Sequence, residues 1–196
     1  GGYAKPGTTL AYQTGTWRVQ QPIHVHAAAP CHHACPAGED AQAYLALVHE
    51  GHFQAAWETL VSANPLPAIT GRVCPHPCET GCNRGQKDGP VGINSVERYF
   101  GDYAIEHGLK AEMIEGEGPK DQKIAVIGAG PSGLSCAYQM ARRGYKVTVF
   151  EGLPKAGGML RYGIPIYRLP REILDAEIQR IVDLGVELKC DTKIGK

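Results

Sequence analysis

The stretch Lys123-Ile-Ala-Val-Ile-Gly128-Ala-Gly130-Pro-Ser-Gly133 decides the fold of the second half of this chain. A short apolar run enters a G-x-G-x-x-G turn, and the residues from Leu134 to Arg143 follow with helical character. A second apolar run, Lys146-Val-Thr-Val-Phe150, ends at Glu151. Strand, glycine turn, helix and strand in this order predict a βαβ unit with a parallel sheet. We therefore expect an α/β Rossmann-type domain, a doubly wound parallel sheet.

The glycine turn predicts a dinucleotide site. Glycines at its first, second and last positions permit a tight turn, a close approach to a pyrophosphate and close helix–strand packing, and the helix N-terminus attracts the anion. The acid that ends the second strand can bond a ribose diol and would repel a 2′-phosphate. The predicted contacts are Gly128, Ala129, Gly130, Pro131, Ser132, Gly133 and Glu151. FAD and NAD share this fingerprint, so the turn alone does not choose between them, and an unliganded glycine-rich turn is the alternative.

Five of the seven cysteines form the pattern Cys31-x3-Cys35-Pro36 and Cys74-x3-Cys78-x3-Cys82. Thiolate sulfur suits iron–sulfur clusters and zinc alike. Zinc ribbons come as paired C-x2-C knuckles, whereas proline directly after a cysteine is a feature of ferredoxin-type ligation. A nucleotide domain also gives a redox cluster something to exchange electrons with. We therefore expect an iron–sulfur site, with structural zinc and free thiols as alternatives. The remaining Cys136 and Cys190 are predicted to be ordinary buried thiols.

Composition excludes several classes of protein. Lys+Arg and Asp+Glu both number 20 in 196 residues, so nothing indicates nucleic acid as a partner. No apolar run approaches the roughly 18 residues of a membrane span, and cysteines without an export signal favour the reducing cytoplasm. Residues 1–30 are predicted to be an extended arm, and Asn94 is predicted to cap a helix through about His107. A polar linker then separates a helical domain, 1–118, from the nucleotide domain, 119–196.

Three runs carry a family resemblance: Asn64-Pro-Leu-Pro, Gly71-Arg-Val-Cys74-Pro-His-Pro-Cys78-Glu and Val96-Glu97-Arg98. With the loop from Lys155 to Pro170, they resemble the glutamate synthase small (beta) subunit family. The resemblance implies an all-α helical ferredoxin-like iron–sulfur domain followed by an FAD-binding domain. It implies FAD contacts at Gly157, Gly158, Met159, Leu160 and Arg168. It also implies a [4Fe–4S] cluster held by Cys35, Cys74, Cys78 and Glu97.

Two assignments stay open at this stage. Glu97 also stands three residues after Asn94, where a capping box would use it to bond the helix N-terminus. The family supplies two further cysteines just before Cys31, which this chain lacks, so Cys31 and Cys82 have lost two partners. Either the chain holds one cluster, or a second cluster recruits other ligands such as His26.

The function expected from this resemblance is electron transfer between NAD(P)H, FAD, the cluster and a partner enzyme or subunit. No side chain is assigned a covalent catalytic role. A second glycine motif for NAD(P)H is absent here, so NAD(P)H would bind outside this segment, and we expect the chain to be a fragment of a larger oxidoreductase. The acceptor would resemble a glutamate synthase large subunit or a dissimilatory sulfite reductase, and the protein would form homo- or hetero-oligomers. The alternative is a non-catalytic scaffold or docking subunit that binds zinc and a dinucleotide.

Overall fold

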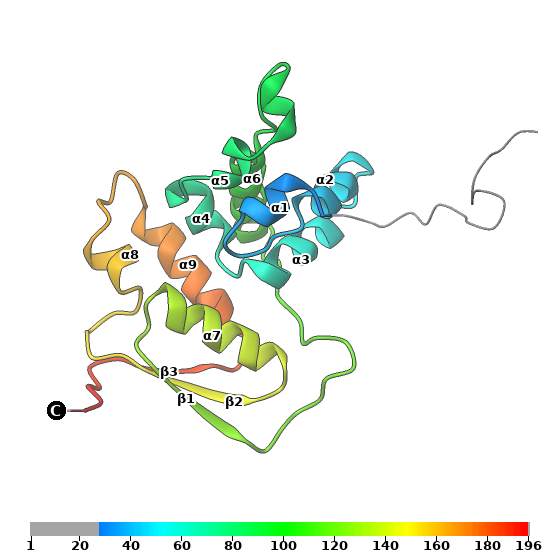
Figure 1. The fold of residues 1–196 in the computed structure, drawn as a ribbon. Helices are drawn as coiled ribbons and strands as arrows, with labels where there is room; N and C mark the ends of the chain where they lie inside the picture. Colours follow the sequence, from blue (N-terminus) through cyan, green and yellow to red (C-terminus); the bar gives the residue numbers. More distant parts are fainter. Residues whose placement is uncertain (1–27, 196) are drawn as a thin grey trace, which may run out of the picture.

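The computed structural model describes residues 28–195, so most of the predicted N-terminal arm, including His26, lies outside the described residues. A helical part comes first and a parallel sheet with its helices follows, as predicted (Figure 1). The helical part comprises α1 (Pro30–Ala34), α2 (Ala41–His49), α3 (Phe53–Ala63), α4 (Pro67–Val73), α5 (Pro77–Thr80), the 3-10 helix η3 (Asn83–Gln86) and α6 (Ile93–Glu106). The sheet part comprises β1 (Lys123–Ile127), α7 (Pro131–Arg142), β2 (Lys146–Phe150), α8 (Met159–Tyr162), α9 (Arg171–Val182) and β3 (Glu187–Lys189).

Capping and apolar periodicity build the helical part. The carboxylate of Asp40 accepts the Ala43 N–H at 3.0 Å and so starts α2. Tyr44 of α2 and Trp57 and Leu60 of α3 are fully buried and join the two helices into one core. The close pairing of α4 with α6 depends on small residues. A Cβ added at Gly71 of α4 would stand 2.5 Å from the Cα of Arg98, so no side chain fits between these helices there.

The stretch after Pro67 forms the short elements α4, α5 and η3, and both α4 and α5 begin at a proline, which is favoured at the first position of a helix. The predictions for three single residues were wrong. Asn94 is not a helix cap, since α6 begins at Ile93 and Gly92 is its N-cap. Cys136 is an exposed thiol, and Cys190, just after β3, is only half-buried.

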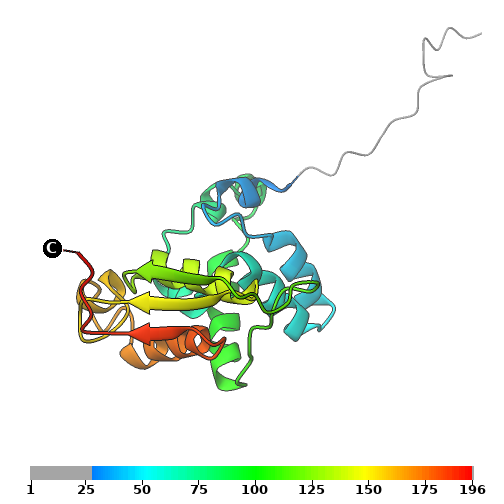
Figure 2. The same ribbon diagram turned by 90° about the horizontal axis from the view of Figure 1, so that it is seen from below.

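The sheet is parallel and ordered β1-β2-β3, with Lys123 opposite Lys146 and Thr148 opposite Glu187. Alternate residues along the strands, such as Val126, Val147 and Val149, are buried beneath the helices. Both α7 and α9 cover the same face of the sheet, and within residues 28–195 no helix covers the other (Figure 2). That open face carries Lys123, Lys146 and Glu187, and also Ile127, which is 68% exposed.

The two parts of the chain pack against each other through α9, which lies on α4 and α6. Gln139 of α7 adds a hydrogen bond from its Nε2 to the Ser62 carbonyl of α3, 2.8 Å long. No helix in the described residues is both long and apolar enough to cross a membrane.

Candidate functional site

A cavity of about 300 Å³ lies where the helical part meets α7. Its walls bring together three of the predicted cysteine ligands, the predicted carboxylate ligand, polar residues and apolar side chains. The lining residues are Cys35, Pro36, Ala37, Glu39, Ala63, Asn64, Pro65, Leu66, Thr70, Cys74, Pro77, Cys78, Glu97, Pro131 and Ser135. The sequence thus predicted four residues that the fold gathers from far apart in the chain.

Each of the three cysteines in this cavity stands at the end or start of a short helix. Cys35 is the C-cap of α1, Cys74 is the C-cap of α4, and Cys78 lies in the single turn of α5. Between Cys74 and Cys78, His76 adopts φ 43°, a left-handed conformation that is unusual for a residue with a side chain. This sharp turn directs the chain from α4 into α5, and both flanking cysteines line the same cavity.

The capping-box interpretation of Glu97 is wrong, because Asn94 lies inside α6 and is not its N-cap. The N–H of Asn94 donates to Glu79 at 2.9 Å. Glu97 is 5% exposed. Its Oε1 accepts a hydrogen bond from Asn64 Nδ2 at 2.6 Å and another from the Thr70 hydroxyl. Among the described residues Oε2 accepts no hydrogen bond. The carboxylate is therefore held by one oxygen, which leaves the other available to a group in the cavity.

Burial sets the electrostatics of this cavity. It raises the pKa of the Cys78 thiol to about 11 and also raises that of Cys74. It raises the pKa of Glu97 to about 7, with the nearby charge of Glu39 acting in the same direction. All three groups are disfavoured as anions in this site, so a bound cation would be needed to stabilise them in their ligating, deprotonated forms.

Cys31 and Cys82 lie outside this set of ligands. Helix α1, which holds Cys31, packs on α5, and a Cβ added at Gly81 beside Cys82 would stand 3.1 Å from Ala34. The two segments are therefore neighbours. Backbone N–H groups of Val91 and Arg84 lower the pKa of the Cys82 thiol, which favours the thiolate form.

The donors fit an iron–sulfur cluster. Thiolates hold iron–sulfur clusters, and the cavity of about 300 Å³ gathers three cysteine thiols together with a carboxylate. Among residues 28–195, no three Cys, His, Asp or Glu side chains lie close enough together to hold a single metal ion.

The predicted dinucleotide turn has the geometry that its glycines suggest. Gly128 adopts φ 94°, and a Cβ at Gly133 would collide with the Gly128 carbonyl group, whose carbon it would approach to 3.1 Å. Helix α7 begins directly at Pro131, with Gly130 as its N-cap. The first N–H groups of α7 therefore face the turn, where a diphosphate would bind.

The second glycine pair lies against this turn. The Gly157 N–H donates to the Ala129 carbonyl at 2.8 Å, and a Cβ at Gly158 would stand 2.9 Å from the Gly130 Cα. The predicted side-chain contacts differ in exposure. Met159 is 71% exposed and Arg168 is exposed, whereas Leu160 is buried in the core.

Glu151 is buried at the end of β2 and ties the turn to the sheet. Its Oε2 accepts the Ala129 N–H at 2.7 Å, and its Oε1 accepts the Leu153 N–H at 2.9 Å. Each carboxylate oxygen has a second lone pair, so these bonds leave acceptor capacity for a ribose hydroxyl.

Sequence reasoning missed the connection between the two sites. Pro131, predicted as a contact of the dinucleotide turn, and Ser135, which was not predicted, both line the cysteine cavity, and their helix α7 begins at that turn. Glu39, Asn64 and Thr70 also line the cavity. Two of these residues had a signal in the sequence: Glu39 follows Cys35 closely, and Asn64 begins the Asn64-Pro-Leu-Pro run that carries the family resemblance. Thr70 gave none, because its contacts arise from tertiary packing.

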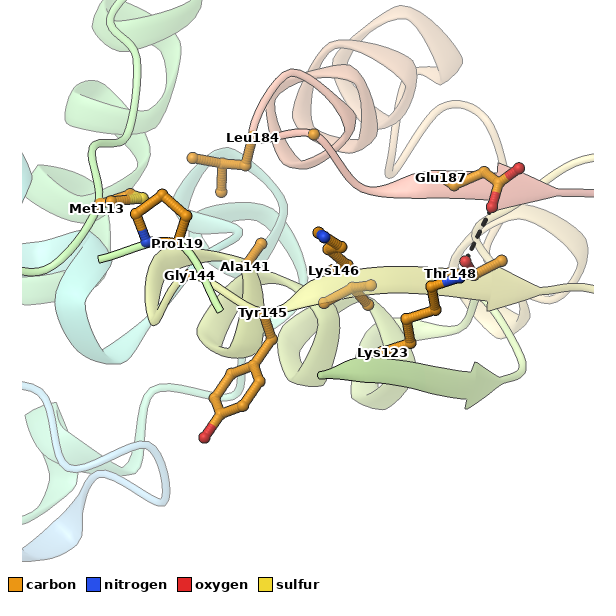
Figure 3. A pocket seen from close by; sticks show the side chains of 12 residues that line it. Met113, Pro119, Lys123, Ala141, Gly144, Tyr145, Lys146, Thr148, Leu184 and Glu187 are labelled. Carbon is orange, nitrogen blue, oxygen red and sulfur yellow. Dashed lines mark hydrogen bonds between the residues drawn. The ribbon is translucent and has the colours of Figure 1, made fainter. Parts of the chain in front are cut away.

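A second cavity of about 400 Å³ lies at the amino-terminal ends of the strands, beside Lys123, Lys146 and the Thr148–Glu187 hydrogen bond (Figure 3). Ligands of parallel α/β sheets bind at the carboxyl ends of the strands. This cavity therefore lies at the opposite end of the sheet from the dinucleotide turn.

Comparison with known families agrees with this arrangement. Residues 24–109 match the family described as dihydropyrimidine dehydrogenase domain II, 4Fe-4S cluster. Residues 126–183 match the NAD(P)-binding Rossmann-like domain. The first match contains the whole cysteine pattern and Glu97, and the second begins at the strand that enters the glycine turn.

Among curated proteins, the chain is 42% identical to the beta subunit of NADPH-Fe(3+) oxidoreductase from Geobacter sulfurreducens, over 95% of this chain and 28% of that protein. It is 41% identical to the PreT subunit of NAD-dependent dihydropyrimidine dehydrogenase from Salmonella typhimurium, over 85% of this chain and 40% of that one. The glutamate synthase [NADPH] small chain of Escherichia coli is 37% identical over 85% of this chain and 35% of its own length.

The chain thus spans between about a quarter and two fifths of the length of the relatives it matches. The resemblance to the glutamate synthase small subunit is confirmed, and so is the predicted order of the two fold types. Residues 24–109 thus match the dihydropyrimidine dehydrogenase domain II model of 4Fe-4S domains, residues 126–183 match the Rossmann-like NAD(P)-binding domain, and the chain is a homologue of subunits of NAD(P)-linked oxidoreductases.

Proposed function

We propose that this chain is the electron-transfer module of an iron–sulfur flavoprotein that passes electrons between NAD(P)H and a partner enzyme. The observation that carries the proposal is the position of α7. This helix begins at the dinucleotide turn and, through Pro131 and Ser135, forms part of the wall of the cysteine cavity. One rigid element thus holds the two predicted cofactor sites at a fixed separation.

In this proposal Cys35, Cys74, Cys78 and Glu97 hold one [4Fe–4S] cluster. Asn64 and Thr70 keep the carboxylate oriented through its Oε1. The apolar side chains of the cavity wall would exclude water, which tunes the potential of such a cluster. Cys31 and Cys82 would join a second cluster only if other ligands completed it.

We propose FAD as the dinucleotide of the glycine turn. When bound, it supplies hydride and single-electron chemistry. The turn and the N-terminus of α7 would bind its diphosphate, and Glu151 would hold its ribose and disfavour a 2′-phosphate. NAD(P)H would bind in a part of the longer protein beyond this segment. A reducing compartment such as the cytoplasm would keep the ligand thiols reduced.

The test is to measure iron, acid-labile sulfide, zinc and flavin per chain after anaerobic purification and reconstitution. We expect about four irons and four sulfides with one FAD. Cys74→Ser and Cys78→Ser should lose most of the iron, while Cys136→Ser, a matched change at an exposed thiol, should retain it. About eight irons would mean that Cys31 and Cys82 hold a second cluster. Zinc without sulfide would refute the electron-transfer function.

The dinucleotide is tested in the same samples. Released FAD should appear in stoichiometric amount, and Gly133→Ala should lose it without losing iron, because its Cβ would collide with the turn. A chain that binds NAD(H) but no flavin would refute the FAD assignment and leave the iron–sulfur assignment intact.

A further inference from the structure

An acidic and a basic side chain are buried together where α9 meets the helical part. Glu177 has no exposed surface, and Arg180, one turn later, is 8% exposed. One carboxylate oxygen of Glu177 accepts a hydrogen bond from the Arg180 guanidinium. Buried charges are costly unless they are paired and hydrogen-bonded, so this pair requires an explanation beyond packing.

The partners of this pair lie more than 100 positions away in the sequence. Glu177 Oε1 accepts the N–H of Ala68 at 2.8 Å, and Arg180 Nη2 donates to the Pro65 carbonyl at 2.9 Å. The guanidinium also lies 5.3 Å from the centre of the Trp57 ring. Both charged groups thus bind the segment in which α4 begins.

Helix α4 needs an acceptor at this end. The first N–H groups of a helix have no partner within it, and the N-cap of α4, Leu66, offers no side-chain hydrogen bond. Pro67 has no N–H, so that of Ala68 is the first one without a partner. Glu177 supplies the acceptor from the nucleotide-binding part and acts as the cap of α4.

The other end of α4 is the cysteine site. Its C-cap is Cys74, and Thr70 in its middle donates to Glu97. Along its length α4 cannot approach α6 more closely, because Gly71 and Gly101 already place backbone against backbone. Because α4 is held at its start by Glu177 and along its side by α6, a shift of α9 would move α4 and, with it, Cys74 at its other end.

We propose that Glu177 is a positioning residue through which the nucleotide-binding part holds Cys74 in place for its ligand, with Arg180 as the charge partner that allows its carboxylate to be buried. The proposal rests on the proposed function, in which Cys74 binds a cluster. In the chain without metal, the position of the Cys74 thiol depends on the same contacts.

The test compares Glu177→Ala and Glu177→Gln with Glu172→Ala, a matched change at an exposed carboxylate of the same helix. In the metal-free chain, alkylation of Cys74 is followed by mass spectrometry. In the reconstituted chain, iron release to a chelator and the electron paramagnetic resonance (EPR) spectrum of the reduced cluster are measured. Circular dichroism establishes that each variant is folded under these conditions.

We expect Glu177→Ala to be alkylated at Cys74 at least fivefold faster, to release iron at least tenfold faster and to show an altered spectrum. The double variant Glu177→Gln, Arg180→Met keeps an acceptor for the Ala68 N–H and leaves no unpaired buried charge. It should return all three readouts to within twofold of wild type. Glu177→Gln alone leaves the Arg180 charge without its anionic partner and should fall between wild type and Glu177→Ala, so it is the variant to read if the alanine variant does not fold.

Two contrary results have different meanings. If the Glu177 variants match Glu172→Ala in alkylation, iron release and spectrum while only their unfolding midpoint falls, the pair serves stability alone and the inference is wrong. If the wild-type chain takes up no iron but Glu177→Ala still accelerates alkylation of Cys74, the proposed function fails and the positioning role stands.

Discussion

Replacing Gly101 by alanine sets helix propensity against packing at the crossing of α4 and α6. Alanine in the middle of a helix is favoured over glycine by about 1 kcal/mol, so propensity alone predicts a more stable protein. The added Cβ would stand 2.7 Å from the Pro67 carbonyl carbon and closer still to the backbone of Ala68. Ordinary contact begins at 3.4 Å, so the two helices would have to separate by at least roughly 0.7 Å.

The packing cost exceeds the gain in propensity. Overpacking costs about 1–3 kcal/mol and occasionally more, and here no side-chain rotation can relieve it because the obstacle is backbone. We expect Gly101→Ala to lower the free energy of unfolding by about 2 kcal/mol, roughly a thirtyfold change in the unfolding equilibrium. With the typical dependence on urea, the midpoint falls by about 1 M. Cluster retention should weaken as well, because α4 ends at Cys74 and α6 holds Glu97.

The assay is urea unfolding of the metal-free chain, followed by circular dichroism and tryptophan fluorescence. Gly85→Ala is the matched control, since nothing lies within 4 Å of a Cβ at that position and its φ is not positive. The control should change stability by less than about 0.5 kcal/mol. If Gly101→Ala is as stable as the control or more stable, the close crossing of α4 and α6 is wrong.

Three further predictions follow from the site. Asn64→Ala should weaken cluster retention by about tenfold, measured as iron lost to a chelator, because it removes a donor that orients Glu97. Asn94→Ala, a change outside the cavity lining, should leave cluster retention unchanged. Gly133→Ala should bind no dinucleotide by isothermal titration calorimetry while its far-ultraviolet circular dichroism keeps the wild-type shape, and full binding would contradict the proposed turn. Burial raises the pKa of Glu177 from 4.5 to about 7, so folding favours its protonated form. Its contribution to stability is present below pH 4.5 and is lost as the pH rises through 7. Glu177→Gln should flatten this part of the curve of stability against pH, measured on the metal-free chain. An unchanged curve would show that Glu177 does not titrate there.

The sequence by itself determined the parts of this protein that depend on local patterns. The glycine turn predicts its strand and helix because only glycine tolerates the positive φ of Gly128 and the close approach at Gly133. The apolar run around Val147 and Val149 predicts the strand that follows this helix. The spacing of Cys74 and Cys78 indicated a soft-metal site, and the family match to a 4Fe-4S domain agrees with it.

Only the tertiary structure decided what each of these residues touches. Glu97 had two consistent interpretations in the sequence, and the start of α6 at Ile93 removed one of them. Glu177 and Arg180 gave no signal, since charged residues on a helix are usually solvated, and their burial arises because α9 packs on α4. Long-range contacts of this kind depend on how whole elements pack, which local periodicity does not encode. The joining of the cysteine cavity to the dinucleotide turn through α7 is the result of that packing.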